Sequence, residues 1–148
     1  MLTREGVKNM PIIDWNVSLM LGVSPFDDHH KRLVDLINLV YDNLITDAPR
    51  EVTELVLNEL LEYTIYHFSE EELWMEQHAY PKLDDQKREH SQFILRIENL
   101  LEEHRTQNAP LSPDTLSFLM NWLSQHIKQK DIQYGVYMAQ QGIPLSVL

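Results

Sequence analysis

The sequence predicts an all-α fold, an antiparallel up-down-up-down four-helix bundle with an irregular N-terminal arm. Apolar residues recur at helical spacing in four segments, and the alternation of apolar and polar residues that is typical of strands is absent. Connections of a few to about ten residues join the segments, and such short connections favour antiparallel neighbours. The chain has 148 residues, 43% of them apolar, so we expect a single domain over residues 1–148.

The N-terminal arm, residues 1–23, shows no sustained period and is expected to pack on the bundle through apolar side chains such as Trp15. The first helix is expected over residues 24–46. Its start carries a cap, a proline suited to the first helical position and the acidic end of a capping box: Ser24, Pro25 and Asp27.

The other three helices are placed by the same signals. The second is expected over residues 50–78, where one face combines apolar, His and Glu side chains at helical spacing. Pro81 begins the third helix, which is expected over residues 81–104. The fourth helix is expected over residues 112–140, because Ser112 precedes a proline and repeats the cap-then-proline pattern of the first.

The charge and composition exclude several classes of protein. The net charge of −11 provides no basic surface for nucleic acid and would be repelled by anionic membranes. No apolar run approaches the ~18 residues of a membrane span, and the N-terminus lacks a signal-peptide pattern. We therefore expect a cytoplasmic protein without nucleic-acid or membrane partners. The absence of cysteine leaves histidines and carboxylates as the available metal ligands.

Each predicted helix places a histidine on its apolar stripe. The set is His30, His67 with Glu71, His90 with Gln86, and His126 followed by Asp131. A single buried histidine is more often hydrogen-bonded within the core than bound to a metal. Four buried imidazoles and a buried carboxylate, however, cannot satisfy one another without large desolvation costs, whereas a divalent metal would satisfy them together. Iron, manganese or zinc would suit these ligands, and two carboxylates able to bridge favour two metals.

The positions of the other polar residues are harder to predict from their spacing along the helices. His126 and Asp131 are five residues apart, or about 140° around an ideal helix. They can converge only from either side of a central site or through a local widening of the helix. His29 is expected to point away from the core, and it and His104 are expected to face solvent or to contact the ligands rather than the metal. His78 lies too far along its helix to share the same metals.

These features together closely resemble the hemerythrin family in its bacterial single-domain form, from Trp15 to Tyr134. The matching segments are Trp15 itself, DDHHKRL, HFSEEELWM, AYP, EHSQF and NWLSQHIKQKDIQY. The ordered set of His, H-x-x-x-E, His and H-x-x-x-x-D on four helices is much more specific than any one of them. The resemblance implies a non-haem di-iron centre, bridged by Glu71, Asp131 and an oxo or hydroxo group, that binds O2 reversibly.

The resemblance also implies how the histidines are divided. His30 and His67 would hold the iron that keeps an open position for O2 or another small diatomic ligand, and His90 and His126 would hold the second iron. The family's third-helix motif is H-x-x-x-H, but this chain has Gln86 in the first position. Gln86 could ligate weakly through its carbonyl oxygen, hydrogen-bond to a water in that place, or leave the second iron partly occupied. We expect weak or water-mediated ligation.

The wall of the O2 pocket is expected to be apolar. Its candidate residues, each one to four residues from a ligand, are Leu33, Phe68, Trp122 and Leu123. Ordinary core packing explains these residues equally well.

The leading interpretation is an O2-binding protein for storage, delivery or sensing, rather than an enzyme. The alternatives are the O2 or redox sensory domain of a signalling protein, and a di-iron enzyme that acts on peroxide or nitric oxide.

Overall fold

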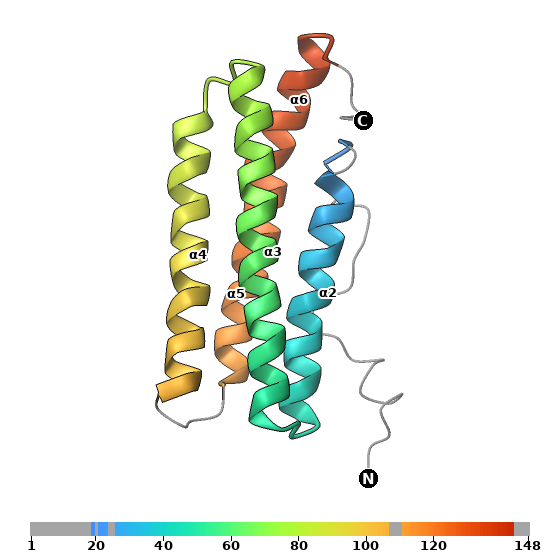
Figure 1. Cartoon of the computed structure of the whole chain (residues 1–148). Helices are drawn as coiled ribbons and strands as arrows, with labels where there is room; N and C mark the ends of the chain where they lie inside the picture. Colours follow the sequence, from blue (N-terminus) through green and yellow to red (C-terminus); the bar gives the residue numbers. More distant parts are fainter. Residues whose placement is uncertain (1–18, 20, 24–25, 107–110, 144–148) are drawn as a thin grey trace.

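The computed structural model describes residues 19, 21–23, 26–106 and 111–143, which form a bundle of four rods (Figure 1). The first three rods are helices α2 (Phe26–Ile45), α3 (Arg50–Gln77) and α4 (Leu83–Thr106). The fourth rod is continuous and consists of α5 (Pro113–His126), a π-helical turn η2 (Ile127–Asp131) and α6 (Ile132–Gln140). The predicted all-α, up-down-up-down bundle is confirmed.

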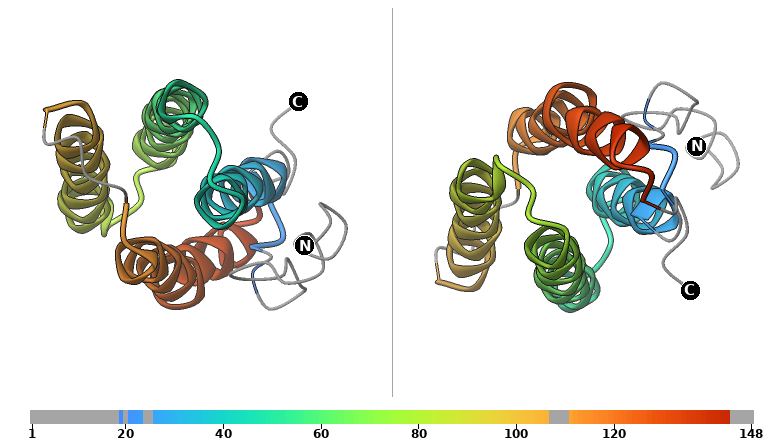
Figure 2. Two further views of the ribbon diagram at one scale, coloured as in Figure 1. Left: turned by 90° about the horizontal axis from the view of Figure 1, so that it is seen from below. Right: turned by 90° about the horizontal axis from the view of Figure 1, so that it is seen from above.

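The four rods surround a common interior. Seen along the bundle, α3 lies between α2 and α4, and the fourth rod closes the opposite side (Figure 2). Helix α3 packs against both α2 and α4, and α2 packs against α5. None of the helices in the described ranges is long and apolar enough to cross a membrane. Most of the predicted N-terminal arm, including Trp15, lies outside the described residues.

Asp27 ties the residues before α2 to the first turn of that helix. Its carboxylate accepts hydrogen bonds from the backbone N–H groups of Leu21 and Gly22. Gly22 has a φ angle of 87°, which a residue without a side chain adopts at little cost. A carboxylate in the first turn is also favoured by the helix dipole. The predicted capping box needs Ser24 and Pro25, which lie outside the described residues.

Two apolar clusters fill the bundle, and most of the buried polar residues fall between them along each rod. The larger cluster includes Leu33 on α2, Leu60 on α3, Phe93 on α4 and Leu119 on α5. The smaller cluster gathers Phe26, Met75, Tyr80, Tyr134 and Met138 near the connection between α3 and α4. A polar layer thus crosses the interior at one level, and it contains the histidines and carboxylates singled out by the sequence.

Ser112 caps the start of α5, where its hydroxyl accepts a hydrogen bond from the N–H of Asp114 (3.1 Å). Replacing Ser112 with Ala is expected to lower the free energy of unfolding by about 1 kcal/mol, because this N–H loses its partner in the folded chain. Denaturant unfolding measures the change. Ser117→Ala, at an exposed position within α5, is the control and should be neutral or slightly stabilising. Equal losses in the two variants would contradict a capping role.

Candidate metal centre

Helices α2 and α3 bring the first group of polar side chains together. His67 and Glu71 lie one turn apart on α3, with 3.2 Å between His67 Nε2 and Glu71 Oε1. His30 on α2 faces them, and its Nε2 lies 3.3 Å from Glu71 Oε2. All three residues are fully buried. Their ligand-type atoms lie within 4.8 Å of one another, so the group could hold a metal ion.

Helix α4 and the fourth rod supply the second group. His90 Nε2 lies 3.1 Å from His126 Nε2, which in turn lies 3.2 Å from Asp131 Oδ1. Between His126 and Asp131 the chain forms the π-helical turn η2, where the N–H of Ile132 donates to the carbonyl of Ile127, five residues earlier. This wider turn brings Asp131 to the face that His126 occupies. Of the two routes that the five-residue spacing allowed, the structure contains the local widening.

The two carboxylates connect the groups. Asp131 Oδ2 lies 3.3 Å from His30 Nε2, and Glu71 Oε1 lies 3.5 Å from His90 Nε2. Each carboxylate therefore touches histidines of both groups. This is the position from which a carboxylate can bridge two metal ions.

The buried atoms of this layer fit a metal better than they fit one another. Several have no hydrogen-bond partner among the described residues: His30 Nε2, His67 Nε2, both carboxylate oxygens of Glu71, and Asp131 Oδ2. Buried polar atoms in proteins are almost always paired, so such a group of buried atoms without hydrogen-bond partners needs an explanation. Imidazole nitrogens and carboxylate oxygens are the donors that iron, manganese and zinc accept. A pair of such cations would satisfy all of these atoms.

The electrostatics of the layer also favour positive charge. Burial alone would lower the pKa of His30, but the carboxylates of Asp131 and Glu71 raise it to about 10. The pKa of His126 is raised to about 9, against the effect of burial, mainly by Asp131. Burial and Asp131 act to raise the pKa of Glu71, yet the surrounding histidines lower it to about 2. The carboxylates stay ionised in a buried layer, and such charges attract cations.

Gln86 lies inside this layer, one turn before His90 on α4, and is 2% exposed. Its amide nitrogen donates a hydrogen bond to Asp131 Oδ1 at 3.1 Å. Its carbonyl oxygen has no hydrogen-bond partner among the described residues. Gln86 thus holds the carboxylate that touches both groups, and it retains one neutral oxygen that can serve a metal or a water.

His29, which was predicted to point away from the core, and His104, which was predicted to face solvent or to contact the ligands, are both buried. His29 is only 7% exposed, and its Nδ1 lies 2.9 Å from Nδ1 of His67, so the expected contact with a candidate ligand is present but the solvent exposure is not. Burial and the neighbouring His67 lower the pKa of His29 to about 4. His104 is 4% exposed, because the last turn of α4 packs against the start of α3 at Arg50. The buried faces of α2 and α4 are therefore wider than the single apolar stripe that the sequence predicts for each helix.

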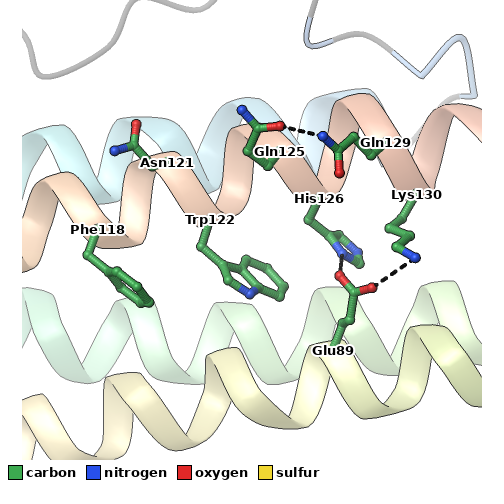
Figure 3. A pocket seen from close by; sticks show the side chains of 8 residues that line it. All are labelled: Glu89, Phe118, Asn121, Trp122, Gln125, His126, Gln129 and Lys130. Carbon is green, nitrogen blue, oxygen red and sulfur yellow. Dashed lines mark hydrogen bonds and ion pairs between the residues drawn. The ribbon is translucent and has the colours of Figure 1, made fainter.

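The predicted pocket wall is buried at three of its four positions, Leu33, Phe68 and Leu123. The Phe68 ring stacks on His90 with 3.8 Å between ring centroids. Trp122 is partly exposed, stacks on His126 at 4.7 Å, and lines a surface cavity of about 270 Å³ beside that histidine (Figure 3). These aromatic rings fix the orientation of the two imidazoles.

Three polar residues near the centre were not found from the sequence. Glu72 and Glu89 contact the outward nitrogens of His90 and His126. Tyr134 is fully buried, and burial raises the pKa of its hydroxyl. The position of each carboxylate on its own helix predicts that it faces solvent. Its contact with an imidazole follows only from the placement of the neighbouring helix. No sequence signal marks this contact.

Comparisons with known proteins agree with this fold. A family model described as the hemerythrin HHE cation binding domain matches residues 21–135. The bacteriohemerythrin of Clostridium acetobutylicum is 32% identical over 126 residues, which cover 81% of this chain and 96% of the relative. That of Methylococcus capsulatus is 30% identical over 127 residues, which cover 85% and 96%. A crystal structure of wild-type hemerythrin gives a TM-score of 0.78 at 28% identity, and the match covers 84% of this chain and 95% of that one.

The chain belongs to the hemerythrin family. Its relatives include bacterial bacteriohemerythrins that it matches over nearly their whole length. Membership supports a non-haem iron protein that binds O2, and the two groups of histidines and carboxylates could hold the metal.

Proposed function

We propose that this chain holds two non-haem irons at the polar layer of its bundle and binds O2 reversibly there, for storage, delivery or sensing. The observation that supports this most strongly is the pair of buried groups that share two carboxylates. The proposed ligands are His30, His67 and Glu71 in one group and His90, His126 and Asp131 in the other. When bound, a pair of irons supplies the reversible O2 binding that side chains alone do not provide.

Different residues of the protein would have different roles around the metals. His30 and His67 would hold the first iron, while Glu71 and Asp131, which touch both groups, would bridge it to the second. The apolar walls would keep water and protons away from the ligand, which favours release of O2 over its reduction. Among the wall candidates, Leu33 is fully buried beside His30 and suits this role.

Optical spectra through cycles of O2 exposure test the proposal. The protein loaded with Fe(II) without air should gain an absorption band on addition of O2 and lose it when O2 is removed, over several cycles. Absence of any change would contradict O2 binding. A change that persists, together with turnover of peroxide or nitric oxide, would favour the enzyme instead, an alternative that Gln86 supports because it leaves the second iron less protected.

A further inference from the structure

Two carboxylates outside the centre contact the outward nitrogens of the second histidine group. Glu72 Oε2 accepts a hydrogen bond from His90 Nδ1 at 2.7 Å. Glu89 Oε1 accepts one from His126 Nδ1 at 3.0 Å, as Figure 3 shows. In both pairs the carboxylate comes from the preceding rod, since Glu72 lies on α3 and Glu89 on α4. The two side chains are 25% and 26% exposed, so water reaches carboxylates whose partners are buried.

The first histidine group has no such carboxylates among the described residues. The outward nitrogen of His67 faces the imidazole of His29 at 2.9 Å. The outward nitrogen of His30 has no hydrogen-bond partner in the described part of the chain. Negative charge therefore lies behind only one half of the centre, and it is the half in which Gln86 replaces a histidine.

The hydrogen bonds fix which ring nitrogen faces inward. An ionised carboxylate can only accept a hydrogen bond, so each ring carries a proton on Nδ1, and Nε2 is the nitrogen that faces the centre and would bind a metal there. A carboxylate behind a metal-bound imidazole also makes the ring a stronger donor, and its loss typically lowers metal affinity 10- to 100-fold. The Nε2 atoms of His90 and His126 lie only 3.1 Å apart, so both nitrogens face the same place in the centre and could bind one metal there.

We propose that Glu72 and Glu89 are positioning residues that make the His90–His126 half of the centre bind a divalent metal tightly although Gln86 replaces a histidine. This inference rests on the proposed function, because it requires a metal in that half. Glu72 has the larger effect of the two. Its contact is shorter, and Glu89 shares its charge with Lys130, which lies 3.3 Å away (Figure 3).

Titration of the whole protein with Fe(II) without air, against a competing chelator, measures the affinity of each of two sites. Glu72→Gln is expected to weaken the second equivalent of iron about 10- to 100-fold, with a smaller loss for Glu89→Gln and little change in the first equivalent. The Co(II) absorption spectrum provides a second readout, because it reports coordination without O2 chemistry. Glu70→Gln and Glu98→Gln remove the same charge from exposed positions on the same two helices and serve as controls.

Glutamine keeps the shape of the side chain and an acceptor oxygen, so each variant without metal should unfold at the same denaturant concentration as the natural chain. If both site variants bind two irons as tightly as the controls, the inference is overturned while the proposed function stands. If the natural chain binds no iron, the proposed function itself fails. A loss at the second site in the Glu72 and Glu89 variants alone supports the inference.

Discussion

Replacing His67 and Glu71 together with leucine is expected to abolish binding of the first iron and yet leave the metal-free bundle at least as stable as the natural chain. Both residues are fully buried, and His67 Nε2 and both Glu71 oxygens have no hydrogen-bond partner among the described residues. Burial lowers the pKa of His67, so Glu71 is the only ionised group of the two. Exchange of buried charged groups for apolar side chains of similar size is often neutral or stabilises by about 1–4 kcal/mol. Glu71 also lies near the like charge of Asp131, and that repulsion disappears in the variant.

Iron per chain and denaturant unfolding in the presence of a chelator measure the two effects separately. Glu70→Leu, an exposed change on the same turn of α3, is the control and should keep its iron. A double variant that still holds two irons would show that Glu71 does not bridge the irons in the natural chain. A metal-free double variant that is several kcal/mol less stable would show instead that the histidine and the carboxylate are satisfied by the protein itself.

The second large effect is expected from Gln86→His. An imidazole is a better donor to iron than a neutral amide oxygen, so the variant should hold its second iron more tightly, by about tenfold or more. It should also oxidise more slowly in air, because the protein would then fill the coordination position that Gln86 leaves to a water or to a weak oxygen ligand. Gln86 donates to Asp131 at 3.1 Å, and the variant loses this hydrogen bond as well.

Gln86→Leu separates the two contributions. It removes the hydrogen bond to Asp131 without adding a ligand, so any gain in affinity that appears only with histidine comes from ligation. Oxidation in air is followed by absorbance, and iron retention by chelator challenge. Equal oxidation rates and equal iron content in the natural protein and Gln86→His would show that Gln86 does not limit the second site.

Much of the fold follows from local patterns in the sequence. The apolar stripes set the four helices, and the cap signal of Ser112 with its following proline sets the start of α5. The stripes also place His30, His67, His90 and His126 inside, because a residue's phase on its own helix decides whether it faces the core. The five-residue spacing before Asp131 indicated a local widening of the helix as one of two solutions, and the fourth rod contains it as the π-helical turn η2.

Contacts that depend on the neighbouring helix could not be predicted in this way. His29 has an outward phase relative to His30, but α2 and α3 pack closely enough at this level for Phe26 and Tyr63 to enclose its ring. Glu72 is likewise in a solvated phase on α3 and meets His90 only because α4 passes beside it. The rotation and offset of one helix relative to the next decide such contacts, and the sequence of either helix alone does not contain them.

The metal content of the natural chain tests the central claim most directly. After anaerobic addition of excess Fe(II) and removal of the unbound metal, we expect two irons per chain and a coloured protein on exposure to air. A colourless chain that retains no iron would contradict it, since the buried carboxylates and imidazoles would then be satisfied without a metal.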